Sequence, residues 1–296
     1  MAVCPAHPLR PTARALLLAA VLGGLLPGCQ VDALRGVILP EENQVDEDGN
    51  VLTEAQVIVA LATDPESDPD LRRQALMKIA RSTAASEPVY LDLFRAVLAD
   101  PKLDTSVAPV LMNALAEHGE PADAASMLPW LDNPEAFTRW RAAVSLQRLH
   151  HPEVIPQLVR KIDEDEDADV RMAAAAALGQ YPRRDVFDAL VRALDDRNFG
   201  VVHAARDALK LLTGHDAGDD PREWTRYARD RPEALLATPQ SYTYQPDSAS
   251  PHWLLFWSQP EVSPQTPKGY SPPKACLLYT SPSPRDQRGS RMPSSA

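Results

Sequence analysis

One phrase of nine residues recurs along this chain and restricts its fold more than any other feature. The phrase has the form V-R-x-x-A-x-x-A-L and reads VRMAAAAAL at residues 170–178. Related copies begin at residues 71, 107, 138 and 201, so successive copies start 36, 31, 32 and 31 residues apart. Such a period is typical of repeat proteins, in which one unit cannot bury its apolar face alone and must stack on its neighbours. The sequence therefore predicts an elongated array of similar units.

An aspartate keeps the same period. It lies six or seven residues before each copy of the phrase, at Asp64, Asp100, Asp132, Asp163 and Asp195. It follows a short apolar segment such as LVRKI or LVRAL, and apolar residues recur three and four places apart, as in an amphipathic helix. We therefore expect each unit to be a helix, an acidic turn and a second helix, with small alanines allowing close packing.

These residues resemble the HEAT-repeat family, in particular the short bacterial form named after phycobilisome lyases. The resemblance implies an all-α fold, an α-solenoid of about five HEAT-like helix pairs over residues 53–212 with a C-terminal helical cap and disordered ends. The pairs are expected at about 53–81, 87–119, 122–150, 153–181 and 185–212. In the family, the turn aspartate and an arginine of the second helix often form a ladder between neighbouring units. The arginine position is matched by Arg72, Arg139 and Arg171 and interrupted at Ala108 and Val202.

A capping helix is expected after the last repeat, within residues 213–237. Gly214 is placed to end the preceding helix. Asp220 followed by Pro221 predicts an N-cap with proline in the first helical turn. Trp224 and Tyr227 lie three residues apart and share one helix face. Because terminal repeats need a cap, we interpret these two aromatic residues as structural, with an aromatic binding pocket as the alternative.

The first 28 residues have the pattern of a signal peptide. Arg10 and Arg14 precede the apolar stretch ALLLAAVLGGLLPG, which is too short to span a bilayer. Its end resembles a bacterial lipobox, which implies cleavage after Gly28 and lipid attachment to Cys29. Gln30 then implies a lipid-anchored protein of the bacterial cell envelope, in the outer membrane and facing the periplasm. An ordinary signal peptide with an incidental cysteine is the alternative.

Both ends of the remaining chain differ in composition from the repeats. Residues 29–52 are polar and are expected to form a flexible tether. Residues 238–275 are rich in proline and contain WLLFW at 253–257, which could be a docking segment or the start of a further domain. The last 21 residues, 276–296, match the translation of sequencing-library adapters in one reading frame, so we expect them to be non-native. The natural sequence would then continue beyond about Lys274.

Charge and cysteine content argue against several function classes. Residues 29–275 contain 25 Lys plus Arg and 40 Asp plus Glu, a net charge of −15. Such a chain repels phosphate groups, which argues against nucleic acid as a partner and against a polybasic membrane patch. Cys4 lies in the signal peptide and Cys276 in the non-native tail, so no disulfide framework is expected.

No catalytic motif occurs, so we expect neither enzyme activity nor a cofactor or metal. The histidines considered lie at helix ends or in turns and are interpreted as structural: His118, His150, His151 and His215.

The acidic run DEDEDADVR at residues 163–171 supplies aspartates at the first three places of an EF-hand calcium loop. Ala168 and Ala174 stand where that loop needs Gly and Glu. Asp169 is expected to cap the next helix. We therefore interpret the run as an enlarged turn between two helices.

Together these features favour a membrane-anchored, periplasmic helical-repeat lipoprotein that acts as a protein-protein interaction scaffold or assembly factor. The stacked second helices would offer an elongated surface to a protein partner. Two alternatives stay open. The chain could be an accessory subunit of a periplasmic enzyme, or a lyase-like HEAT protein acting on a bound cofactor, because some members of that family act on bilin chromophores.

Overall fold

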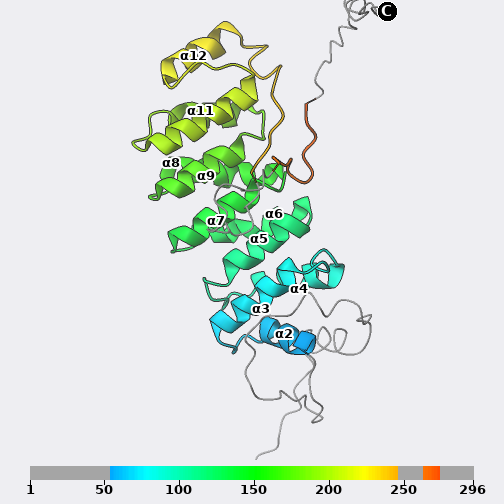
Figure 1. Cartoon of the computed structure of the whole chain (residues 1–296). Coiled ribbons are helices and arrows are strands. Elements are labelled where there is room, and N and C mark those ends of the chain that lie inside the picture. Colours follow the sequence, from blue (N-terminus) through cyan, green and yellow to red (C-terminus); the bar gives the residue numbers. More distant parts are fainter. Residues whose placement is uncertain (1–53, 246–262, 274–296) are drawn as a thin grey trace, which may run out of the picture.

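The structure is a computed structural model that describes residues 54–245 and 263–273 (Figure 1). Its helices follow one another in pairs. The first helices are α2 (Glu54–Thr63), α4 (Pro88–Leu98), α8 (Ile155–Glu164) and α10 (Arg184–Ala193). The second helices are α3 (Pro69–Arg81), α5 (Ala108–His118), α7 (Ala136–Leu146), α9 (Ala168–Leu178) and α11 (Phe199–Thr213). The last helix, α12 (Pro221–Asp230), follows the fifth pair.

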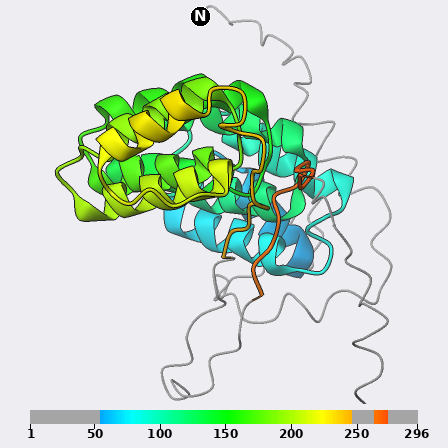
Figure 2. The ribbon, with the colours of Figure 1, turned by 90° about the horizontal axis from the view of Figure 1, so that it is seen from above.

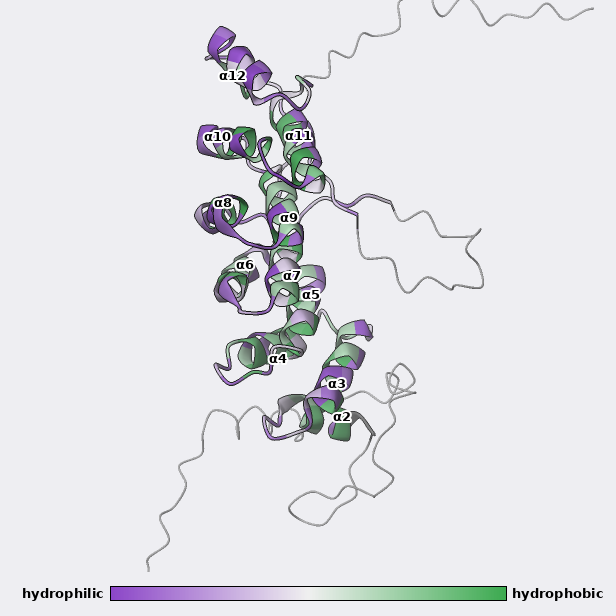
Figure 3. Cartoon of the chain, turned by 90° about the vertical axis from the view of Figure 1, so that its left-hand side faces the viewer, coloured by the Kyte–Doolittle hydropathy of each residue, from purple (hydrophilic) through white to green (hydrophobic). Residues whose placement is uncertain are grey.

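The helices form two layers stacked along one axis. Figure 3 shows α4, α6, α8 and α10 in one column and α5, α7, α9 and α11 in the other, and Figure 2 shows the layers from above. Each second helix packs on the next one, from α5 through α7 and α9 to α11. The predicted all-α solenoid of about five helix pairs with a C-terminal helical cap is confirmed. The described residues contain no β-strand, only isolated bridges between Leu149 and Lys268 and between Tyr244 and Gln265.

Several predicted features lie outside the described residues. These are the signal peptide, Cys29, the tether, the WLLFW segment and the adapter-like tail. Among the helices of the described ranges, none has the length and apolar composition needed to cross a membrane.

Side-chain caps fix where several helices begin. The carboxylate of Asp68 accepts hydrogen bonds from first-turn N–H groups of α3, and Asn198 and Asp220 cap α11 and α12 in the same way. These N–H groups have no partner within the helix, so a cap stabilises the first turn. The cap of α9 is Asp167, so the expectation that Asp169 caps this helix is wrong. The helix begins at Ala168, two residues earlier than expected, which places Asp169 inside the first turn.

The third pair departs from the others because its first helix is divided. The three parts are η2 (Pro121–Asp123), α6 (Ala124–Met127) and η3 (Leu128–Asp132). Pro129 has no N–H to continue the α-helical hydrogen bonds of α6, and the N–H of Leu128 instead bonds the carbonyl of Ala125 in a tighter 3₁₀ turn. A short 3₁₀ turn, η4 (Pro152–Val154), also precedes α8.

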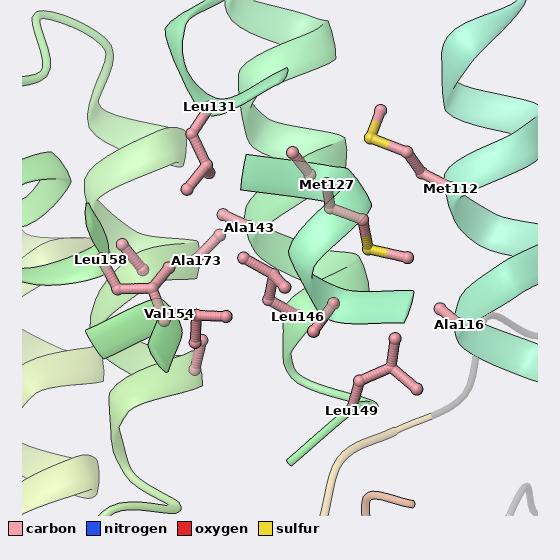
Figure 4. Packing of buried hydrophobic residues seen from close by; sticks show 14 of the residues in the cluster. Met112, Ala116, Met127, Leu131, Ala143, Leu146, Leu149, Val154, Leu158 and Ala173 are labelled. Carbon is pink, nitrogen blue, oxygen red and sulfur yellow. The ribbon is translucent and has the colours of Figure 1, made fainter. Parts of the chain in front are cut away.

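One continuous apolar interior runs through all five pairs. Figure 4 shows part of it, where Met112 of α5, Met127 of α6, Leu146 of α7 and Leu158 of α8 point into a shared interior. All four side chains are fully buried. Within the described residues, neighbouring pairs therefore bury their apolar faces against one another.

Small side chains let the second helices approach closely. Four alanines of α9 are buried, namely Ala173, Ala174, Ala175 and Ala177. A methyl group added at Gly179 would lie 3.3 Å from the methyl carbon of Ala208 on α11. Ala208, an alanine of the repeated phrase, therefore lies at the contact between α9 and α11.

After α12 the chain returns along the side of the solenoid. We call residues 263–273 the strap (orange in Figure 1). The N–H of Lys268 donates to the carbonyl of Arg148, and the N–H of His150 donates to the carbonyl of Lys268, both at 2.8 Å. The Lys268 ammonium donates to the carbonyl of Gly119 at 2.9 Å. The strap thus connects the C-terminal part of the chain to the second and third helix pairs.

Candidate interaction surface

Two arginines of the repeated phrase join consecutive turns. Arg139 of α7 donates from Nε and Nη2 to the two carboxylate oxygens of Asp165, both at 2.9 Å. Its Nη1 donates to the carbonyls of Asn133 and Pro134 in its own turn, both at 3.0 Å. Arg171 of α9 repeats this arrangement one unit later, with Asp196 as the bidentate partner at 2.7 and 3.0 Å. We call these two pairs the arginine ladder.

The ladder ends where the arginine position is occupied by another residue. Ala108 of α5 stands at this position in the second unit, and the next turn carries Asn133 where the later turns carry Asp165 and Asp196. Asn133 still accepts from the N–H of Glu135, as Asp165 does from the N–H of Asp167. In the first unit, Arg72 is buried and donates from Nε to the carbonyl of Ala62 at 3.1 Å.

The periodic aspartates have different partners from those that the family resemblance suggested. Asp132 accepts from Arg160 and Lys161 of α8, at 2.7 and 2.9 Å. Asp163 accepts from Arg192 of α10 at 2.7 Å. These pairs join the first helices of neighbouring units. The aspartates that meet the phrase arginines lie further along the chain, at Asp165, two residues after Asp163, and at Asp196, one residue after Asp195. In the fourth unit, α8 continues through Glu164, so Asp163 lies within the helix.

The three other periodic aspartates lie in the turns. Asp64 accepts from the N–H of Glu66, and Asp100 from the N–H of Lys102, each at 3.0 Å. Asp195 is exposed beside Asp196. The side chains of Asp64 and Asp100 therefore shape their turns.

The acidic run of the fourth unit is divided among separate structural tasks. Asp163 meets Arg192, Asp165 meets Arg139 and Lys161, and Asp167 caps α9. Burial alone would raise the pKa of Asp165, but hydrogen bonds from Arg139, from the N–H of Asp167 and from Lys161 outweigh it and hold the pKa below its ordinary value. Within the described residues, no three His, Cys, Asp or Glu side chains are grouped so as to hold a metal ion.

His118 and His150 take part in packing. His118 ends α5, where its Nε2 donates to the carbonyl of Ala80 at 2.9 Å. The ring of His150 stacks on Tyr181 with centroids 4.8 Å apart and meets the edge of Tyr270 in the strap at 5.5 Å. Burial lowers the pKa of His150, which favours the neutral ring.

The remaining two histidines also make structural contacts. The backbone of His151 exchanges hydrogen bonds with the Tyr181 hydroxyl. The His215 ring stacks on Tyr227 with centroids 4.4 Å apart.

The aromatic residues of α12 close the end of the solenoid. Trp224 is fully buried, lies edge-on to Phe187 of α10 at 6.3 Å, and donates from Nε1 to the carbonyl of Gly218 at 2.7 Å. Tyr227 lies beside it, against His215. Asp220 accepts from the N–H of Arg222 at the start of the helix. This arrangement covers the last pair and leaves the Trp224 ring inside the protein.

An exposed apolar surface lies on the second helices, and the sequence did not predict it. Phe137 of α7 is 59% exposed and Phe199 of α11 is 72% exposed, at the first turns of their helices. Trp140 of α7 and Met172 of α9 are half-buried. Both occupy the same position in their helices, five residues after the N-cap residue. The same position in neighbouring helices of a solenoid faces the same side. We call Phe137, Trp140, Met172 and Phe199 the aromatic ridge, after its three rings.

Contacts among its members give the ridge a defined shape. The rings of Phe137 and Trp140 lie 5.5 Å apart, and the guanidinium of Arg141 lies 4.8 Å from the centre of the Trp140 ring. A methyl group added at Gly200 of α11 would lie 3.3 Å from the Met172 sulfur, so α9 and α11 meet at this level. The centres of the Phe199 and His203 rings lie 6.4 Å apart. The ridge therefore crosses three consecutive second helices.

Carboxylates line the ends of these helices beside the ridge. Glu135 precedes α7, Asp169 lies in the first turn of α9, and Asp195 lies in the turn before α11, and all three are exposed. The nearby guanidinium groups of Arg139 and Arg171 are already bound to Asp165 and Asp196. Arg197, in the turn before α11, is exposed as well. The three exposed carboxylates outnumber this cation, so the border of the ridge carries a net negative charge.

Comparison with known proteins supports the repeat architecture. Residues 126–210 match the family described as HEAT repeats. This segment is similar to HEAT repeats. It covers most of the third to fifth helix pairs, with the arginine ladder and the whole aromatic ridge.

No curated protein matches the sequence. The chain is similar to a structure of human deoxyhypusine hydroxylase in complex with glycerol at 19% identity, over 53% of this chain and 73% of that chain, with a TM-score of 0.29.

Proposed function

We propose that this HEAT-repeat protein is a non-catalytic scaffold that binds a protein partner through the aromatic ridge on its second helices. The observation that carries the proposal is the exposure of Phe137 and Phe199, which lie on one layer with Trp140 and Met172 between them. Large aromatic side chains dominate the energetics of many interfaces, and their exposure to water is unfavourable in the absence of a partner.

The ridge differs from the rest of the described surface. The one further large apolar side chain exposed in the described ranges is Val89, at 36%, on the first-helix layer. Rigid helices, held in register by the arginine ladder, present the ridge with little loss of conformational freedom on binding. Helical-repeat proteins use such extended layers for partner binding.

Site-specific photo-crosslinking in the source cells tests this function. A benzophenone amino acid is placed at position 137, 199 or, as the matched control, 89. We expect the first two positions to give an adduct with the same partner and position 89 to give none. Equal adducts from all three positions, or none from the ridge, would contradict the scaffold function.

We also propose that the scaffold is lipid-anchored in the bacterial cell envelope through Cys29 and acts at the outer membrane as an assembly factor facing the periplasm. The support is the basic and apolar sequence before Cys29 and its lipobox-like end. Metabolic labelling with a fatty acid tests the anchor, because Cys29→Ala should abolish labelling. Equal labelling of the variant and the wild type would contradict it.

A further inference from the structure

We infer that the aromatic ridge binds a cationic amphipathic helix of another protein. This inference rests on the proposed scaffold function and specifies the chemistry of the partner. It is drawn from the dimensions of the ridge, from its apolar composition and from the charge around it.

The ridge has the dimensions of a short helix. It crosses α7, α9 and α11, and neighbouring packed helices lie about 8–10 Å apart. The two outer helices are therefore about 16–20 Å apart. A partner helix rises about 1.5 Å per residue, so about 11 to 13 residues would cover this distance. Its apolar side chains at every third or fourth position could contact Phe137, Trp140, Met172 and Phe199 in turn.

The charged side chains around the ridge favour a partner with positive charge. Glu135, Asp169 and Asp195 are exposed at its border, one for each of the three helices. The cations of the ladder are bound to other carboxylates, and Arg141 lies over Trp140. Arg197 is an exposed cation in the turn before α11, where it is outnumbered by the three carboxylates. Lys or Arg side chains on one edge of the partner helix would therefore meet carboxylates, and they could also lie over the exposed rings of Phe137 and Phe199.

The same charge argues against the other possible occupants. The chain carries a formal net charge of −11, so a second copy would bring like charge to the ridge. An anionic membrane surface would be repelled for the same reason. A cationic helix is the occupant that satisfies both the apolar ridge and its acidic border.

Binding of designed peptides to the full chain tests the inference. The probe is a fluorescein-labelled 14-residue peptide of Lys and Leu with Leu at helical spacing, and binding is followed by fluorescence anisotropy. Two comparison peptides are used, one with Glu replacing every Lys and one with the same Lys and Leu in scrambled order. We expect the Lys/Leu helix to bind at least tenfold more tightly than either comparison peptide.

Variants of the protein separate ridge binding from general attraction between opposite charges. Phe137→Ser with Phe199→Ser should weaken binding of the Lys/Leu peptide at least tenfold, whereas Val89→Ser should leave it unchanged. Glu135→Gln with Asp169→Asn should weaken binding severalfold and reduce its salt dependence. Circular dichroism of each variant checks that the helices are retained, as expected for exposed positions.

Two outcomes would overturn the inference, namely equal affinity for the Lys and Glu peptides, or full affinity after loss of both phenylalanines. A third result separates it from the proposed function. If positions 137 and 199 crosslink a cellular partner that the Lys/Leu peptide does not displace, the cationic helix is wrong while the scaffold function stands. If no partner crosslinks there, the scaffold function itself is contradicted.

Discussion

Arg139 and Asp165 form a bidentate ion pair between two repeats, and their side chains are only 7% and 2% exposed. Water therefore contributes little to the solvation of either charge in the folded protein. Removing one member would leave the other charge buried with fewer partners, which is costly. The pair thus makes the junction between the third and fourth units sensitive to substitution.

We expect Arg139→Ala to lower the free energy of unfolding by about 3–5 kcal/mol, as for other buried pairs that lose one member. Arg226→Ala is the control, because the Arg226–Glu223 pair of α12 is exposed on both sides. Its loss should cost about 0.2–1 kcal/mol. Urea denaturation of both variants measures the difference, and equal small losses would show that the buried pair does not stabilise the junction.

Attachment of the strap should depend on pH through His150. The ring lies between Tyr181 and Tyr270, accompanied by Gln180 and His151, and burial lowers its pKa below the ordinary 6.5. A group with a lowered pKa in the folded state contributes stability above its unfolded pKa, and this stability is lost as pH falls through the folded pKa. The strap should therefore be firmly attached at pH 7.5 and weaken as the pH falls below about 6.5.

The hydrogen-exchange protection factor of the Lys268 amide measures this, because that N–H donates to the carbonyl of Arg148. His150→Phe should keep the ring packing and remove most of the pH dependence. The control, His203→Gln, replaces an exposed histidine outside the strap and should behave as the wild type. Unchanged protection between pH 7.5 and 5.5 in the wild type would argue against the role of His150.

Gly214 should resist substitution more than Gly218. Both have a positive φ, 69° and 79°, which disfavours any residue with a side chain. A methyl group at Gly214 would lie 2.6 Å from the carbonyl oxygen of Thr238, whereas at Gly218 no atom lies within 4 Å. Thermal unfolding should show Gly214→Ala as the more destabilising, by about 1 kcal/mol or more beyond the conformational cost of about 1 kcal/mol that both share. Equal losses would mean that the chain after α12 moves aside freely.

Leu146 should be among the most sensitive apolar positions. It is fully buried in α7 at the junction shown in Figure 4. Leu146→Ala should lower the free energy of unfolding by about 2–5 kcal/mol, because the side chains of several helices surround the space it would leave. Leu71→Ala at a half-buried position of α3 is the control and should cost less. A similar loss from both would show that the interior closes around the deletion.

The sequence predicted the solenoid because its period of 31 to 36 residues is carried by two markers at once, the phrase and the aspartate. It predicted the arginines of the ladder but not their partners. The partner depends on how far the first helix extends, and α8 continues through Glu164, which moves the contact from Asp163 to Asp165. In the third unit, the first helix is divided at Pro129. The sequence shows this proline, but where the helix ends around it also depends on tertiary packing.

The aromatic ridge and the strap were missed for different reasons. An apolar side chain in a helical pattern is assigned to the interior, yet Phe137 and Phe199 face outward. A signal was present, since Phe137 stands one residue and Phe199 two residues before a copy of the phrase, at positions where no other unit has a large apolar residue. The strap has no helical period, and its contacts join residues far apart in the sequence, which a local pattern does not reveal.

The hydrogen bond from the Lys268 ammonium to the carbonyl of Gly119 joins residues that lie 149 positions apart in the sequence. Most other contacts between helices in this fold join the same or adjacent units. Neighbour contacts can form as each unit leaves the ribosome, whereas this bond must wait until residue 268 has been synthesised. Strap docking therefore follows the folding of the repeats, and its high sequence separation favours slow formation. The solenoid would first exist as a strapless array, whose exposed edge at Leu149 and His150 is covered only when translation has passed the end of the repeats.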